Sequence, residues 1–322
     1  MPRETDSDLA PGRSPIFRRI LSGLSLLVCV GAIATVYRGL QETDWPLVWA
    51  NLNQISLRQL GFALIFVACS YGAIACYDVL AFRYLQKKLA LRKILFAGLI
   101  TYSISPNVGF AFLSGSVLRY RLYRQWWVSN VDIAKIIAFT NLSLWVGLIP
   151  MTGLVFVATN FELPETIATS FMLLTPTQFG VILLVMSALY LGVVGRIQKP
   201  IRWRKFSLEF PTWQLTIQQV GVFAFDWGFA ALTLSFLLGH PLLFPTFFRV
   251  YVIAMVAGLM STIPGGLGVF ETVMVFFLEP NQTREDILAV LIVFRCLYYF
   301  LPFTLAVFAL ISFEVMQRLR KI

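Results

Sequence analysis

Charged residues are scarce in this sequence. Asp, Glu, Lys and Arg make up 13% of its 322 residues, and hydrophobic residues make up 58%. A soluble globular domain usually contains about 25% charged residues. The composition therefore excludes an ordinary soluble fold. Together with long apolar runs, it predicts an all-α polytopic membrane protein.

Histidine and cysteine are also rare. His240 is the only histidine, and the four cysteines (Cys29, Cys69, Cys76 and Cys296) all lie inside apolar runs. Buried cysteines of this kind usually act as small hydrophobic residues. Because no cluster of cysteine and histidine is present, there is no candidate zinc or iron site. We therefore expect no metal and no cofactor.

Catalytic signatures are missing as well. The sequence contains no Gly-x-Ser-x-Gly, no His-Glu-x-x-His and no Gly-x-x-x-x-Gly-Lys, which are patterns of serine hydrolases, zinc proteases and phosphate-binding loops. The run Gly265-Gly-Leu-Gly268 is not a dinucleotide fingerprint, because no soluble strand–helix unit surrounds it. The sequence therefore argues against an enzyme.

The net charge of +10 suggests a nucleic-acid partner at first, but the distribution of the basic residues argues against one. Lys and Arg form short clusters beside apolar runs, as the positive-inside rule predicts for cytoplasmic loops. In the resulting topology, 21 of the 26 basic residues are cytoplasmic. We expect a protein of the cytoplasmic (inner) membrane with both termini in the cytoplasm and a disordered N-terminal segment, residues 1–15.

Six apolar runs are long enough to cross the bilayer as helices, which takes about 20 residues each. Successive runs must cross in opposite directions, and the basic clusters give each crossing its direction. The six spans are expected at about Arg19–Tyr37, Leu57–Phe82, Asp132–Ala158, Gln178–Val194, Trp213–Leu238 and Ile287–Val315.

Two further apolar segments, 94–118 and 244–278, do not fit as simple spans. The first has basic clusters on both sides, so a crossing helix would place one cluster outside. The second is interrupted at Ser261–Glu271 by a proline and three glycines, which forbid a continuous helix. We predict two re-entrant hairpins of half-helices. Segment 94–118 enters from the cytoplasm and breaks within Ser103–Gly109, and segment 244–278 enters from outside.

The order span, span, hairpin, span then occurs twice from opposite sides. It predicts an inverted-topology repeat of residues 16–160 and 176–318, joined by an external loop at 161–175. Inverted repeats with broken helices at their interface recur in secondary transporters. Matching residues occur in the same order in both halves: Asp78 and Asp226, Gly98 and Gly258, Pro106 and Pro264, Asp132 and Asp286, and Pro150 and Pro302.

Charges inside apolar segments cost about 2.5–3.5 kcal/mol each on insertion scales, so they usually face a partner or a cavity. Glu271 and Arg295 lie in consecutive segments and can pair. The pair either holds the second hairpin in place or also lines the path of a polar headgroup. Asp78 and Asp226 occupy equivalent repeat positions, which suggests a shared role. Further candidate binding residues are Arg119 at a hairpin end and Asn107 within the first hairpin.

Three stretches carry a family resemblance: Pro264-Gly-Gly-Leu-Gly-Val-Phe-Glu271, Arg295-Cys-Leu-Tyr-Tyr-Phe-Leu-Pro302 and Gly115-Ser-Val-Leu-Arg119-Tyr. They resemble the transmembrane region of lysylphosphatidylglycerol synthases, the flippase part of the multiple peptide resistance factor. The resemblance extends from about Phe17 to Ser312. In bifunctional members this region moves aminoacylated phosphatidylglycerol between leaflets, and a separate soluble domain makes that lipid. Since the sequence shows no such domain, we expect no synthase activity. The resemblance implicates Pro264, Gly265, Gly266, Gly268, Glu271, Arg295 and Arg119 in substrate binding.

Repeat and resemblance together predict a lipid flippase, with the headgroup passing through a cavity between the two hairpins. The expected partners are membrane phospholipids, anionic or aminoacylated, together with a second copy of the chain or a separate lipid-modifying enzyme. Two alternatives stay open. One is a non-transporting scaffold or accessory subunit that presents lipid, and the other is a coupled transporter for a small solute.

Overall fold

The structure is a computed structural model that describes residues 43–108, 111–158, 175–196, 201–203, 206–208, 210–239, 242–261 and 263–319. Residues from Asp44 onward form one compact unit. The predicted N-terminal segment 1–15, the predicted first span Arg19–Tyr37 and the predicted external loop up to residue 174 lie outside the described residues, as does His240.

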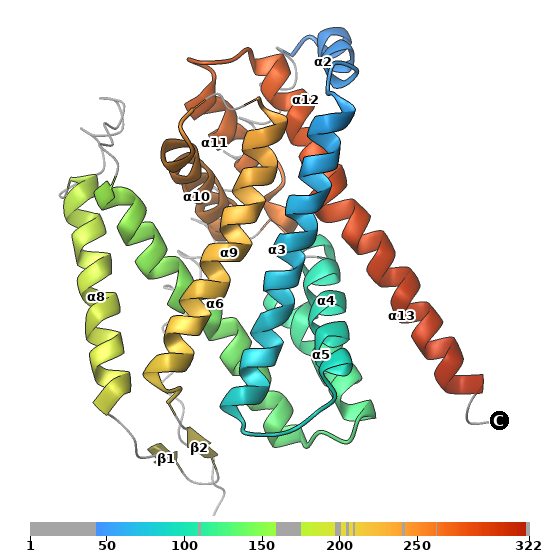
Figure 1. The fold of residues 1–322 in the computed structure, drawn as a ribbon, viewed down its shortest axis with the longest axis vertical. Coiled ribbons are helices and arrows are strands. Elements are labelled where there is room, and N and C mark those ends of the chain that lie inside the picture. Colours follow the sequence, from blue (N-terminus) through green and yellow to red (C-terminus); the bar gives the residue numbers. More distant parts are fainter. Residues whose placement is uncertain are drawn as a thin grey trace, which may run out of the picture. The chain divides into compact units, whose positions relative to one another are not determined.

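Helices make up almost all of the described elements, and one small antiparallel β-hairpin connects α8 to α9 (Figure 1). In chain order the elements are α2 (Trp45–Leu52), α3 (Leu57–Tyr84), α4 (Leu91–Val108), α5 (Ala111–Gln125), α6 (Asn130–Ala158), α8 (Pro176–Arg196), β1 (Ile201–Trp203), β2 (Phe206–Leu208), α9 (Trp213–Leu237), α10 (Phe244–Met260), the 3₁₀ turn η1 (Pro264–Gly266), α11 (Val269–Leu278), α12 (Arg284–Arg295), the π-helical segment η2 (Cys296–Phe300) and α13 (Leu301–Leu319).

Five helical stretches are long and apolar enough to cross a membrane: Leu57–Tyr84, Asn130–Ala158, Pro176–Val194, Trp213–Leu237 and Arg284–Leu319. They coincide with five of the six spans predicted from the sequence, and the sixth lies outside the described residues. Local signals set their ends. For example, α3 begins at a capping box in which Ser56 and Gln59 satisfy each other's backbone N–H groups.

The two interrupted segments each form a pair of shorter helices. The first pair, α4 and α5, lies in the lower half of Figure 1, and the second pair, α10 and α11, lies in the upper half. The break of the second pair falls at residues 261–268, as predicted. We predicted that the first pair breaks within Ser103–Gly109. Most of this range is helical instead, because α4 continues through Pro106 to Val108. Pro106 leaves the carbonyl of Tyr102, four residues earlier, without its N–H partner, a loss that membrane helices tolerate where neighbouring protein groups or a cavity satisfy the backbone.

The last apolar stretch is one helix interrupted by the π-helical segment η2. Pro302 lacks an N–H group, and its ring crowds the carbonyl group four residues earlier, at Tyr298. The backbone widens at this point, so that the N–H of Leu301 bonds to the carbonyl oxygen of Cys296, five residues back. The wider turn changes the direction of the side chains that follow Arg295.

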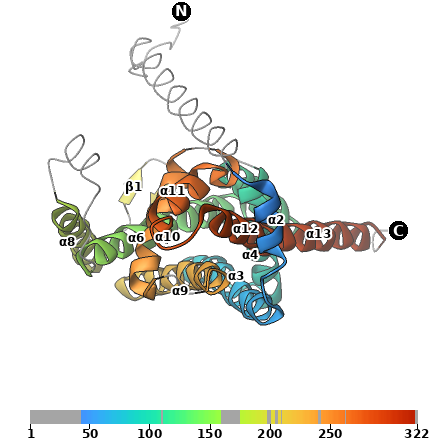
Figure 2. The ribbon, with the colours of Figure 1, turned by 90° about the horizontal axis from the view of Figure 1, so that it is seen from above.

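Buried apolar side chains form two clusters. One surrounds the second helix pair together with α9 and α12, and includes Tyr251 and Phe270. The other surrounds the first helix pair together with α3 and α6, and includes Leu122 and Ile136. Helices α3 and α9 lie side by side along their length in both views (Figures 1 and 2). The fold therefore places α3 and α9 together, with one helix pair packed in each cluster.

Helices α6 and α8 approach closely at Gly153 and Gly180. A Cβ atom added at residue 180 would lie 2.9 Å from the carbonyl oxygen of Gly153, closer than real contacts allow. Gly192, further along α8, has no atom within 4 Å of its added Cβ. In a membrane, close backbone approach at small residues is a main source of helix association, because lipid supplies no hydrophobic force between helices.

We expect Gly180→Ala to lower the melting temperature of the purified protein in detergent, since overpacking costs about 1–3 kcal/mol. Gly192→Ala is the matched control on the same helix and should leave the melting temperature unchanged or slightly higher, because alanine is the better helix former. Equal melting temperatures for the two variants would contradict the described contact between α6 and α8.

Candidate functional site

A cavity of about 360 Å³ lies between the two helix pairs. Its walls come from α4 and α5 on one side, from α10 and η1 on the other, and from α3, α6, α9 and η2. The lining is mostly aromatic and apolar, with a few polar groups. It includes Tyr71, Tyr77, Thr101, Tyr102, Ser105, Arg119, Asn141, Asp226, Gly265, Gly266, Phe270, Tyr298 and Tyr299.

The first buried ion pair joins α5 to α3. Nε and Nη2 of Arg119 donate to the two carboxylate oxygens of Asp78 at 3.0 and 2.9 Å, and both side chains are buried. The hydroxyl of Tyr123 donates to the same carboxylate at 2.7 Å. The ring centroid of Tyr102 lies 4.7 Å from the Arg119 guanidinium. This two-point geometry satisfies the carboxylate and fixes the direction of Arg119.

The second ion pair joins the end of α12 to α11 and to the turn η1. Nε of Arg295 donates to Glu271 at 2.7 Å, and Nη1 donates to the carbonyl oxygen of Gly265 at 2.7 Å. The rings of Tyr299 and Phe270 lie 4.6 and 5.4 Å from the guanidinium. Nη2 is buried and has no hydrogen bond to the described residues. The pairing of Glu271 with Arg295 predicted from the sequence is therefore confirmed.

Glycines make the turn between α10 and α11 possible. Gly265, Gly266 and Gly268 have φ angles of 61°, 61° and 83°, a left-handed conformation that other residues rarely adopt. A Cβ on Gly266 would lie 2.9 Å from the Cα of Gly258 on α10. Glu271 closes the turn, since its second oxygen accepts the N–H of Gly268 at 2.7 Å. The carboxylate thus caps α11 and holds Arg295 at once.

Asp226 on α9 is held differently. Ser70 donates to its Oδ1 at 2.7 Å, and the hydroxyl of Tyr298 lies 3.3 Å from the same oxygen. Tyr71 positions Tyr298 by donating to its backbone carbonyl at 2.9 Å. Asp226 is only 6% exposed, and no ion pair joins it to a cation among the described residues. Asp78 and Asp226, equivalent in the repeat, therefore have different partners.

The predicted binding residues fall into three groups. Arg119, Asp226, Gly265 and Gly266 line the cavity. Asp78, Gly268, Glu271 and Arg295 support the wall from behind through the contacts described above. Asn107 donates to the backbone carbonyl of Ser103 at 2.9 Å, a local bond within α4. Pro264 begins η1, and its side chain lies outside the described atoms.

Sequence reasoning missed the tyrosines. Tyr71, Tyr77, Tyr102, Tyr298 and Tyr299 all line the cavity. A signal was present, because tyrosine in membrane helices is normally enriched at the interfaces. These tyrosines lie instead within apolar segments, where each hydroxyl group needs a buried partner or a cavity.

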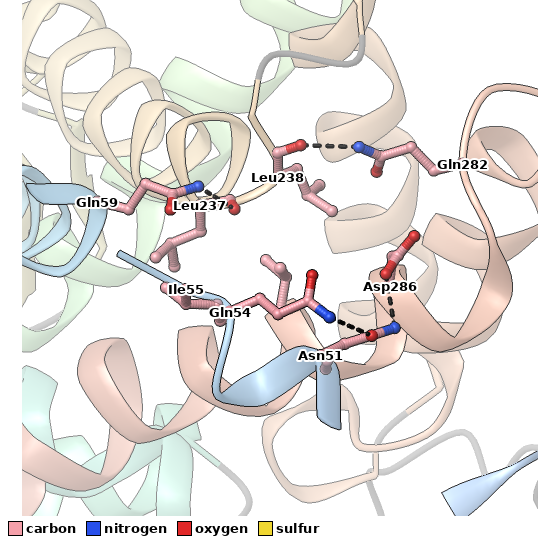
Figure 3. Close-up of a pocket in the computed structure, with 10 residues that line it drawn as sticks. Asn51, Gln54, Ile55, Gln59, Leu237, Leu238, Gln282 and Asp286 are labelled. Atoms are coloured by element: carbon pink, nitrogen blue, oxygen red, sulfur yellow. Dashed lines mark hydrogen bonds between the residues drawn. The ribbon is translucent and has the colours of Figure 1, made fainter. Parts of the chain in front are cut away.

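A second, smaller pocket of about 160 Å³ lies between α2, α9 and α12 (Figure 3). Side-chain amides of Gln59 and Gln282 donate to the last backbone carbonyls of α9, at Leu237 and Leu238. The amide of Asn51 donates to Asp286 at 2.6 Å, which ties α2 to α12. These contacts satisfy carbonyl groups that every helix leaves open at its C-terminus. The pocket is thus accounted for as a structural cap.

Comparison with known proteins places the chain among bacterial membrane proteins. It is 38% identical over 292 residues to an uncharacterized protein of Synechocystis, covering 90% of each chain. It is 26% identical to the inner membrane protein YbhN of Escherichia coli, covering 92% of each chain. It is 25% identical over 314 residues to phosphatidylglycerol lysyltransferase of Staphylococcus aureus, covering 94% of this chain and 35% of that enzyme. No family model matches the chain.

We expect Arg119→Ala to destabilise the protein strongly. The substitution leaves the buried Asp78 without its cation, which typically costs about 3–5 kcal/mol. Arg121→Ala on the same helix is the control, because Arg121 and its partner Glu314 are 54% and 26% exposed and such a pair contributes about 0–1 kcal/mol. Thermal unfolding in detergent measures both. An equal decrease in melting temperature for the two variants would show that the Arg119–Asp78 pair does not hold α5 against α3.

Proposed function

Because the chain belongs to the family that comprises the transmembrane region of phosphatidylglycerol lysyltransferases and related inner membrane proteins, we propose that it moves a phospholipid or another polar-headgroup lipid between the leaflets of the inner membrane. The proposal assigns it no catalytic step. Lysyl transfer to phosphatidylglycerol is what the name of the Staphylococcus relative states, and the match covers 35% of that enzyme.

The observation that carries this proposal is the central cavity. A cavity of about 360 Å³ falls in the size range of small-molecule sites, which suits a headgroup but not two acyl chains. The cavity lies between the two helix pairs, in a protein with five helical stretches apolar enough to cross a membrane. In the proposed mechanism the headgroup occupies the cavity while the acyl chains stay in lipid.

The proposed membrane arrangement is six spans and two re-entrant hairpins, with both termini in the cytoplasm. In it, α4 and α5 form the hairpin that enters from the cytoplasm, and α10 and α11 form the one that enters from outside. The side-by-side packing of α3 and α9, which correspond in the proposed inverted repeat, supports this arrangement. Broken helices that meet at such an interface are a common place for substrate in transporters.

The charged residues define what the headgroup would meet. Arg119 lines the cavity wall, and its guanidinium is paired with the carboxylate of Asp78. The Arg295 guanidinium donates to Glu271 and to the carbonyl oxygen of Gly265. Only its Nη2 has no hydrogen-bond acceptor among the described residues. A phosphate oxygen would therefore bind as an additional acceptor beside the Arg119–Asp78 pair. Arg295, behind the wall, would act through the position of Gly265, which lines the cavity. We propose that the arginines orient the headgroup without becoming free cations.

Filling the cavity tests the proposal. Asn141 lines the cavity from α6, whereas its neighbour Leu142 is 58% exposed and faces away. We expect Asn141→Trp to slow the movement of a fluorescent phospholipid headgroup across proteoliposome membranes by at least about tenfold, the factor that corresponds to 1.4 kcal/mol. Leu142→Trp should move lipid at the wild-type rate.

Three outcomes decide between the candidates. Slow movement in Asn141→Trp alone supports transport through the cavity. Wild-type protein that binds lipid but moves none refutes transport and favours a lipid-presenting scaffold. Equal movement by the wild type and both variants would remove the cavity from the mechanism.

A further inference from the structure

Asp226 differs from the other two carboxylates of the cavity region. Asp78 and Glu271 each contact an arginine. Both hydrogen bonds that Asp226 receives, from Ser70 and Tyr298, go to Oδ1. Its Oδ2 accepts no hydrogen bond from the residues that the structure describes, although the side chain is 94% buried and lines the cavity. One oxygen is thus fixed by the protein, and the other is left for the contents of the cavity.

Among the residues that the structure describes, the titratable groups that interact with Asp226 are tyrosines. Tyr71 and Tyr77 approach it from α3, Tyr102 from α4, Tyr251 from α10, and Tyr298 and Tyr299 from η2. The wall from α6 adds Thr140 and Asn141, which do not titrate. Tyrosine hydroxyls are neutral near pH 7. Since both nearby arginines contact other carboxylates, no described side chain neutralises a negative charge on Asp226.

An isolated carboxylate in such a place is costly. Removing an ionised group from water without a cation costs so much free energy that the group normally takes up a proton instead. A protonated carboxyl group keeps Oδ1 as the acceptor for Ser70 and Tyr298 and turns Oδ2 into a donor that faces the cavity. The observed hydrogen bonds are compatible with this form, because neither requires Oδ2.

We propose that Asp226 is a proton-binding site of the cavity. The proton is held on Oδ2 when the cavity contains no cation, and it leaves to water when a positively charged group takes its place against the carboxylate. The charge of the wall is then balanced at every stage, by the proton or by the bound cation. Exchange of this kind would couple headgroup movement to the proton gradient, and this coupling rests on the proposed function, whereas the proton site itself does not.

The proton site can be tested without transport. In infrared difference spectra of the purified full-length protein, a pH change should produce the C=O band of a buried carboxylic acid. Asp226→Asn should remove this band, and Ser70→Ala should shift its frequency, because Ser70 donates to the same carboxyl group. A spectrum unchanged by Asp226→Asn would overturn the proton site. Size-exclusion profiles and melting curves of both variants establish that they are folded.

The coupling is tested in proteoliposomes that contain a pH-sensitive dye and a fluorescent phospholipid with an amine headgroup. We expect an imposed pH gradient to change the rate of lipid movement by the wild type and leave the rate of Asp226→Asn unaffected. If the wild type moves lipid at the same rate with and without the pH gradient, the coupling is overturned and the proposed function stands. No lipid movement at all, with the infrared band present, would refute the proposed function and leave the proton site standing.

Discussion

The structure depends on one constraint: a charged group taken out of water needs a partner. Desolvation costs several kcal/mol per ion, and only good geometry with additional hydrogen bonds offsets it. Arg119 meets this requirement through a two-point contact with Asp78, and Arg295 through Glu271 and the carbonyl of Gly265. Each pair connects a broken helix to a longer helix. The contacts that neutralise the charges therefore also hold the two helix pairs on opposite sides of the cavity.

The elements of the fold could largely be predicted from the sequence because their signals are local. Apolar length identified five long helices, and the left-handed glycines marked the turn between α10 and α11. The end of α4 was harder to predict. Pro106 looked like a breaker, but α4 continues past it, and the side chains of Ser105 and Asn107 bond to carbonyl oxygens of the preceding turn. Whether a helix continues past a proline depends on the packing around it, which a pattern of residue types does not contain.

The candidate site was predictable only where its partners are close in sequence. Glu271 and Arg295 lie in consecutive segments, which made their pairing a reasonable inference. Arg119 lies 41 residues from Asp78 in the sequence, and only the folded structure shows that the two side chains pair. Tyr298 is placed beside Ser70 and Asp226 by the π-helical segment, and this widening of the backbone has no clear signature in the sequence apart from Pro302.

The two halves of the proposed repeat meet the same constraint with different residues. In the first half Arg119 lies on α5 of the first helix pair, and its partner Asp78 lies on the long helix α3. In the second half Glu271 lies on α11 of the second helix pair and Arg295 lies on α12. Asp226 on the long helix α9 therefore pairs with no arginine that the structure describes, and its carboxylate is hydrogen-bonded by Tyr298 instead. The difference between the two halves does not by itself drive lipid across the membrane. At equilibrium it only sets how strongly the lipid binds to each conformation of the protein. Net movement of a lipid against its concentration gradient needs an energy source, and in the proposed mechanism the proton that binds to Asp226 couples this movement to the proton gradient.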